Sequence, residues 1–213
     1  MSQLSSPRKL LGLCGSLRAR SYNLGALQAA AELLDAQLGS LQIASLRGIP
    51  IYEADEQKEG FPAEVLALGE AIRAADAVLI ASPEYNFGIP GGLKNALDWL
   101  SRLPDAPLRG KPVAILGAAT GPVGTARMQY ELRKVLLFLD AEVLGKPEIF
   151  ISHAASKFDA SGRLVDAQTR AFMGTQLQAL LALIARIQAG ACQSPDVLLQ
   201  RRVCPDIPSA LKT

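Results

Sequence analysis

The residues best suited to bind a ligand follow the first apolar segment of the chain, residues 10–14. The next residues form the pattern G-S-x-R-x-x-S-x-N, whose members are Gly15, Ser16, Arg18, Ser21 and Asn23. Hydroxyl and amide groups hydrogen-bond to phosphate oxygens, and the planar guanidinium of an arginine matches phosphate geometry. A helix that begins here adds free N–H groups and the positive end of its dipole. The pattern predicts a cup for a terminal phosphate.

The same residues allow a plainer interpretation. Ser21 can serve only as the cap of the following helix, and Arg18 can be a solvated surface charge. Their combination directly after a strand favours phosphate binding, because ligands of open α/β sheets bind at the carboxyl ends of strands. Neither G-x-x-x-x-G-K-[ST] nor G-x-G-x-x-G occurs at this place, so the P-loop and dinucleotide-fingerprint interpretations lose their main support.

A second candidate loop lies in SPEYNFGIPGGLKNALDWLSR, residues 82–102, directly after the apolar segment AVLIA. Pro83 and Pro90 stiffen this loop, and its glycines let the backbone approach a flat ligand closely. Tyr85 offers an aromatic surface to such a ligand. The alternative is that Tyr85 and Phe87 anchor the loop on the core.

A third candidate loop, GAATGPVGTARMQY, spans residues 117–130 and follows another apolar segment. Thr120 adds a hydroxyl, and Gly121 and Gly124 again permit close backbone approach. A phosphate cup beside two loops of this kind fits a mononucleotide with a large flat head. Flavin mononucleotide (FMN) fits these features best.

These loops depend on elements that bring them to one place. Apolar segments of strand length alternate with segments of helical period, which predicts an α/β domain with a parallel, doubly wound sheet covered by helices on both faces. The strands are expected at residues 10–14, 41–44, 77–81, 112–117 and 142–144, the last resuming at 148–151. The helices are expected at residues 23–38, 63–75, 93–103, 125–139 and 166–188. We expect one domain over residues 1–190 and a loosely held extension over 191–213.

Composition excludes several classes of protein. Lys and Arg number 22 against 20 Asp and Glu, and the basic residues are scattered, so a nucleic-acid partner is not expected. Cys14, Cys192 and Cys204 are widely spaced, and there is one histidine, which leaves little material for a disulfide framework or a zinc site. No apolar run reaches the roughly 20 residues of a membrane span. We therefore expect a soluble, cytoplasmic protein without a metal and without a membrane partner.

From about residue 9 to residue 188 the chain resembles the NAD(P)H-dependent FMN reductase family, which has a flavodoxin-like fold and includes bacterial chromate and quinone reductases and some azoreductases. The motifs that carry the resemblance are GSLRARSYN, SPEYNFGIPGGLKNALDWLSR and GTARMQYELRKVLLFLDAEVL, each in order and after the expected strand. The resemblance implies a five-stranded sheet of order 2-1-3-4-5. It also implies transfer of a hydride from NADPH or NADH to FMN, and then of two electrons to an acceptor such as a quinone, azo compound, chromate or free flavin.

The resemblance also implies roles for particular residues. Those implied to hold the FMN phosphate are Ser16, Leu17, Arg18, Ser21 and Asn23. Those implied to border the flavin ring are Pro83, Glu84, Tyr85, Asn86, Ala119, Thr120 and Gly121, with Tyr85 near the nicotinamide or acceptor. Some relatives have Ser at the position of Ala119, where Thr120 offers the replacement hydroxyl. Subunit contacts of a homodimer or homotetramer are implied at Arg127, Tyr130 and Glu148. No side chain is expected to act as a catalytic acid or base, because the flavin performs the chemistry.

Two rival functions remain for comparison. One is an electron carrier of the flavodoxin type without nicotinamide turnover of its own; the near-neutral charge and Arg18 in the phosphate loop disfavour it. The other is a serine esterase, since GSL superficially resembles a nucleophile loop. Such an enzyme needs a histidine oriented by an acid, and Phe150 occupies the position three residues before His153.

Overall fold

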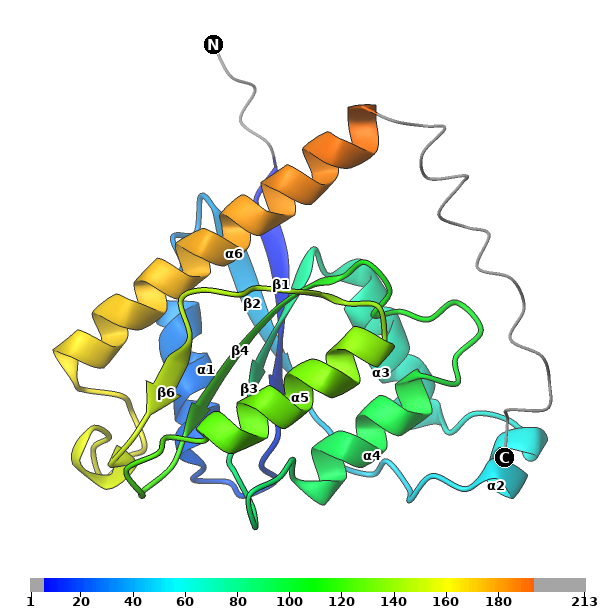
Figure 1. The fold of residues 1–213 in the computed structure, drawn as a ribbon, viewed down its shortest axis with the longest axis horizontal. Helices are drawn as coiled ribbons and strands as arrows, with labels where there is room; N and C mark the ends of the chain where they lie inside the picture. Colours follow the sequence, from blue (N-terminus) through cyan, green and yellow to red (C-terminus); the bar gives the residue numbers. More distant parts are fainter. Residues whose placement is uncertain (1–5, 194–213) are drawn as a thin grey trace.

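A parallel sheet forms the centre of the computed structural model, which describes residues 6–193 (Figure 1). Its strand order is β2-β1-β3-β4-β5, and β6 also pairs with β4. The strands are β1 Arg8–Cys14, β2 Gly39–Ala44, β3 Ala77–Ala81, β4 Pro112–Ala118, β5 Glu142–Val143 and β6 Ile149–Ile151. This order is that of flavodoxin-like sheets, so the expected doubly wound fold is confirmed.

The last sheet position is filled by two short pieces of strand. β5 aligns Glu142 with Pro112 at the start of β4, and β6 aligns Ile149 with Leu116 near its end. Both pieces therefore lie along the same side of β4, with residues 144–148 looping out between them. The expectation of a fifth strand that breaks and resumes is confirmed.

Helices cover both faces of the sheet (Figure 1). One apolar cluster packs α1 and α6 against β1, β3 and β4, and the other packs α3, α4 and α5 against the opposite face. β3 and β4 are buried along their whole length, which explains their uninterrupted apolar sequences. The helices are α1 Tyr22–Leu33, α2 Ala54–Glu59, α3 Ala63–Ala74, α4 Gly91–Leu100, α5 Ala126–Phe138 and α6 Ala167–Gln193, with a short 3₁₀ helix at Ala154–Ser156.

The first helix is shorter than its apolar spacing predicts. It ends at Leu33, where the expected helix continues to residue 38. The Asp35 carboxylate accepts a hydrogen bond from the Gln37 N–H at 2.8 Å, and the Asp35 carbonyl accepts from the Leu38 N–H at 2.8 Å. Aspartate favours such turns over the helix interior, and this turn leads directly into β2.

Other elements also differ from expectation. The short helix α2 lies in a segment expected to be loop, and α4 ends at Leu100, three residues early. The last helix continues to Gln193, so residues 191–193 of the expected extension are helical, whereas 194–213 lie outside the described residues. Within residues 6–193, none of the helices combines the length and apolar character needed to cross a bilayer.

Candidate functional site

The three predicted loops meet at the carboxyl edge of the sheet, because β1, β3 and β4 are parallel neighbours. The Gly15 N–H donates to the Ala81 carbonyl at 2.9 Å, and the Ser82 N–H donates to the Leu116 carbonyl at 3.1 Å. A Cβ atom at Gly15 would lie 2.2 Å from Ser82 Oγ. The loops after β1 and β3 are thus packed so closely at their bases that only glycine fits at position 15.

Asn23 joins the first loop to the third. Its side chain is buried, its Nδ2 donates to the Ala118 carbonyl at 3.0 Å, and its Oδ1 accepts from the Ala118 N–H at 2.8 Å. These two bonds fix the start of α1 against the end of β4. The visible role of Asn23 is therefore to position the loops around the predicted phosphate cup.

The loop after β1 presents backbone donors that no protein acceptor uses. Among residues 6–193, the N–H groups of Ser16, Leu17, Ala19 and Arg20 have no partner, while the Arg18 N–H donates to Ser16 Oγ at 3.3 Å. Ser21 caps α1, since its Oγ accepts from the Asn23 N–H at 3.2 Å. Free N–H groups at the start of a helix suit an anion.

The side chains of this loop strengthen its preference for an anion. Arg18 and Arg20 are exposed, and neither forms an ion pair with a carboxylate of the described chain. The Arg18 guanidinium lies 5.6 Å from the centre of the Tyr22 ring, in a cation–π contact. The donor set as a whole therefore fits the phosphate of FMN.

The loop after β3 forms a tight hairpin turn. The Tyr85 N–H donates to the Gly88 carbonyl at 3.2 Å, and the Gly88 N–H donates back to the Tyr85 carbonyl at 3.0 Å. Asn86 and Phe87 between them have φ angles of 50° and 70°, the left-handed region that disfavours side chains. The turn exposes the rings of Tyr85 and Phe87, which are 53% and 66% accessible. They lie in solvent, so neither ring anchors the loop in the core.

The loop after β4 leaves backbone open to a ligand. Thr120 and Gly121 are exposed, and a Cβ atom at Gly121 would meet nothing within 4 Å. The loop is held from behind, because the Ala119 N–H donates to the Ile151 carbonyl at 3.0 Å and the Gly121 carbonyl accepts from the His153 N–H at 3.2 Å. A flat ring can therefore approach the 120–121 backbone without displacing a side chain.

The three residues implied in subunit contacts lie on or beside α5. Arg127 pairs within the chain with Glu84, its Nε lying 2.6 Å from Oε1. Tyr130 is 51% exposed. The Glu148 side chain is largely covered and is paired with Lys146 and, at 3.9 Å, with Arg133; hydrogen bonding to Lys146 is the main cause that lowers the pKa of Glu148. Arg127 and Glu148 are therefore paired within one chain, whereas the Tyr130 ring is exposed on α5.

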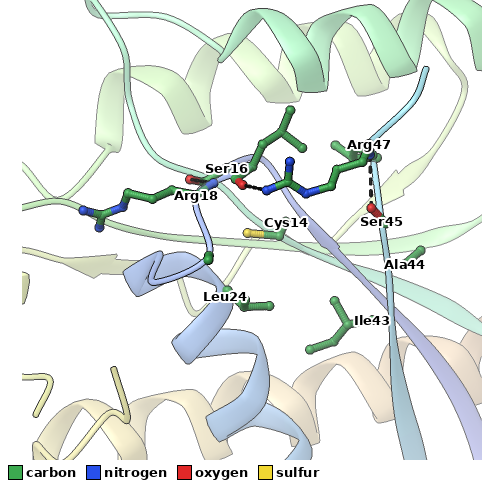
Figure 2. Close-up of a pocket in the computed structure, with 11 residues that line it drawn as sticks. Cys14, Ser16, Arg18, Leu24, Ile43, Ala44, Ser45 and Arg47 are labelled. Atoms are coloured by element: carbon green, nitrogen blue, oxygen red, sulfur yellow. Dashed lines mark hydrogen bonds between the residues drawn. The ribbon is translucent and has the colours of Figure 1, made fainter. Parts of the chain in front are cut away.

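Arg47 lies next to the proposed phosphate loop, and the sequence patterns did not single it out. It follows β2, and its Nη2 donates to the Leu17 carbonyl in the phosphate loop (Figure 2). The two residues are 30 positions apart. A lone arginine in SLRGIP carries no motif, so only the strand order, with β2 beside β1, could have pointed to it.

Cys14 lies at the base of the first loop and faces a cavity beside it (Figure 2). Burial is the main cause that raises the pKa of the Cys14 thiol above its usual value, against smaller lowering effects of hydrogen bonds from Ser16 and Ser21. The thiol is therefore protonated and a poor nucleophile at neutral pH. Within the described part of the chain, acidic, histidine and cysteine side chains form no cluster that could hold a metal ion.

The chain is similar in sequence to known proteins. The family model described as NADPH-dependent FMN reductase matches residues 8–156. An NAD(P)H-dependent FMN reductase of Pseudomonas aeruginosa is 50% identical over 185 residues, which cover 87% of this chain and 100% of the relative. A quinone reductase of Escherichia coli K12 is 45% identical over 187 residues, with coverage of 87% and 100%.

A solved structure is also similar. The flavoenzyme NAD(P)H:(acceptor) oxidoreductase of Paracoccus denitrificans superposes with a TM-score of 0.76 at 30% identity, covering 84% of this chain and 98% of that one.

Proposed function

The chain belongs to the NADPH-dependent FMN reductase family, and we propose that the oxidising substrate of this FMN-dependent NAD(P)H oxidoreductase is a quinone. The overall reaction consumes NAD(P)H, a proton and a quinone and yields NAD(P)⁺ and a hydroquinone. Support comes from a relative of 45% identity that is named a quinone reductase and is covered over its full length. Bound FMN supplies the two-electron redox chemistry between donor and acceptor.

One observation carries this proposal: unpartnered backbone donors of the loop after β1 lie at the same sheet edge as two exposed loops with open backbone. We assign the phosphate to the first loop, where free N–H groups, hydroxyls and a guanidinium are available. The residues in this assignment are Ser16, Leu17, Arg18 and Ser21, with Asn23 positioning them. We assign the ring to the other two loops, through Pro83, Glu84, Tyr85, Asn86, Ala119, Thr120 and Gly121.

The proposed ring site leaves access for a second planar molecule. Tyr85 is half exposed on the turn after β3, and Thr120 and Gly121 in the loop after β4 are exposed. Such an open site admits acceptors of different shape, so azo compounds, chromate and free flavin are further candidate acceptors. We propose that Tyr85 contacts the nicotinamide or the acceptor.

The proposal extends to the cellular compartment and the oligomeric state of the enzyme. We infer a cytoplasmic enzyme, because widely spaced cysteines suit a reducing compartment and the donor is NAD(P)H. We also infer a homodimer or homotetramer whose subunit contacts include Tyr130, which is exposed on α5, and the neighbouring pairs of Arg127 and Glu148.

The test is steady-state turnover of the FMN-loaded protein under anaerobic conditions. Loss of NADPH absorbance is followed with and without a soluble benzoquinone. We expect quinone-dependent oxidation of many equivalents of NADPH per flavin. Oxidation of no more than one equivalent would mean an electron carrier of the flavodoxin type, and would contradict the proposed enzyme.

A further inference from the structure

A cavity of about 370 Å³ shares one wall, Ser16, Leu17 and Arg18, with the proposed phosphate site and extends from it toward β2. The rest of its lining comes from the end of β1, the start of α1, the end of β2 and the segment 45–47 that follows β2; no residue of the loops after β3 and β4 contributes. In the sheet, β2 and β3 flank β1 on opposite sides. The cavity therefore lies on the β2 side of β1, and the ring site lies on the β3 side.

The walls of this cavity combine an apolar slot with a cationic rim. Leu24, Ile43 and Ala44 form apolar surface, and Arg47 reaches across from the segment after β2 (Figure 2). Ser45 adds a hydroxyl at the same rim, where its Oγ accepts from the Arg47 N–H at 3.1 Å. Such a slot suits a flat apolar group that carries an anion.

Among residues 6–193, the Arg47 guanidinium uses only one of its two terminal nitrogens in a hydrogen bond. It donates from Nη2 to the Leu17 carbonyl, and it forms no ion pair with any carboxylate of residues 6–193. A guanidinium has five N–H donors in a planar fork that matches phosphate. Arg18 lines the same cavity but points away from Arg47 in Figure 2, so Arg47 is the arginine directed across the slot.

We propose that this cavity binds the adenosine end of NADPH and that Arg47 binds the 2′-phosphate. The proposal rests on the proposed function, since the donor is a nicotinamide dinucleotide. The 2′-phosphate is the only group by which NADPH differs from NADH, so Arg47 becomes the residue that selects NADPH. From β2 to β4 the sheet edge spans three strand spacings, roughly 15 Å, which an extended dinucleotide bridges between this cavity and the ring site.

The first test measures binding apart from turnover. The FMN-loaded protein is titrated by calorimetry with 2′,5′-ADP, which carries the 2′-phosphate, and with 5′-AMP, which lacks it. We expect 2′,5′-ADP to bind about 10- to 100-fold more tightly, the range for hydrogen bonds to a charged group. Equal affinity for the two nucleotides would overturn the proposal.

The second test compares variants by the ratio of kcat/KM for NADPH to that for NADH. Arg47→Ala is expected to lower this ratio about 10- to 100-fold. Ala44→Phe fills the slot without removing the guanidinium, and it is expected to weaken 2′,5′-ADP binding. Arg109→Ala is the matched control, because Arg109 is exposed next to Asp140, away from the cavity lining, and its loss is expected to leave the ratio unchanged.

These tests distinguish failure of the proposed NADPH site from failure of the proposed enzyme activity. Arg47 also donates a hydrogen bond to the Leu17 carbonyl in the phosphate loop. The FMN affinity of the Arg47→Ala variant is therefore measured as well. An unchanged ratio in Arg47→Ala, or an equal fall for both donors together with loss of FMN, would mean that Arg47 only positions the phosphate loop and would overturn the proposal. Failure of the wild-type protein to oxidise either donor would instead contradict the proposed function.

Discussion

The Glu84 carboxylate fixes the hairpin turn after β3 to the start of α5 through Arg127. Its Oε1 accepts from Arg127 Nε at 2.6 Å and its Oε2 from the Met128 N–H at 3.1 Å, while the Glu84 side chain is only 7% exposed. The Arg127 guanidinium in turn lies 3.8 Å from the centre of the Phe87 ring. One carboxylate thus connects a loop of the proposed ring site to the helix that follows the other loop.

Replacing Glu84 with Gln is expected to destabilise the fold and weaken FMN binding. The substitution removes the charge that pairs with Arg127, and a charge-assisted bond of this kind contributes about 1.5–3 kcal/mol. Urea unfolding of the FMN-free protein measures the first effect and flavin titration the second. Glu131→Gln is the control: Glu131 pairs with Lys134 on the exposed face of α5, and its loss is expected to cost less than about 1 kcal/mol. Equal effects of the two substitutions would contradict the role of Glu84.

Phe87 should tolerate glycine better than alanine. Its φ angle is 70°, where a residue with a side chain costs about 1 kcal/mol more than glycine. Both substitutions remove the contact with Arg127, so their difference isolates the backbone strain. We expect Phe87→Gly to be the more stable variant by about 1 kcal/mol in urea unfolding. At Tyr130, inside α5, the order should reverse, with alanine the more stable by about 1 kcal/mol.

Asn23→Ala is expected to lower the free energy of unfolding by about 2–4 kcal/mol. It removes two hydrogen bonds and leaves the buried N–H and carbonyl of Ala118 without partners. Asn23→Asp keeps an acceptor for the N–H but sets a carboxylate against the Ala118 carbonyl, so it should also destabilise. Denaturant melts measure both variants. A loss below about 0.5 kcal/mol in Asn23→Ala would show that the bridge between α1 and β4 contributes little.

Glu148 should make stability depend on pH. Hydrogen bonding to Lys146 and the nearby Arg133 and Tyr130 lower the pKa of Glu148 in the folded state, against the raising effect of burial. A carboxyl group with a lowered folded pKa stabilises the fold above its unfolded pKa of about 4.3, and this contribution is lost as the pH falls through the folded value. Glu148→Gln should therefore destabilise by up to about 1 kcal/mol at pH 7 and by less at pH 3. Thermal melts of wild type and Glu148→Gln at both pH values check this. A stability difference between them that is larger at pH 3 than at pH 7 would contradict the prediction.

Local patterns in the sequence were enough to predict a parallel, doubly wound sheet and the placement of the three loops, whereas the strand order was implied by the family resemblance. The uninterrupted apolar runs of β3 and β4 are the direct result of burial on both faces, and each loop motif follows its strand without a gap. The start of α1 at Tyr22 fits Ser21 as its cap. Its end was wrong by five residues, because the turn at Asp35 competes with the helical apolar spacing that continues to Leu38.

Contacts between distant residues could not be predicted in this way. Glu84 and Arg127 are 43 positions apart, and Asn23 and Ala118 are 95 apart, so no local pattern reports either contact. Asn23 was interpreted as a phosphate ligand from its type and place, which stays a prediction, and the bridge that its amide makes to Ala118 was not predicted. Arg47 was missed for the same reason, since its significance arises only when β2 lies beside β1.

The central claim is that the loop after β1 binds the phosphate of FMN, and flavin titration of the purified protein tests it most directly. FMN and riboflavin are added in turn to flavin-free protein, and quenching of flavin fluorescence is followed for wild type, Arg18→Ala and Arg109→Ala. The claim predicts tight binding of FMN, much weaker binding of riboflavin, and a loss of FMN affinity of about 10- to 100-fold in Arg18→Ala alone. Equal affinity for FMN and riboflavin in the wild-type protein, or no binding of either, would contradict it.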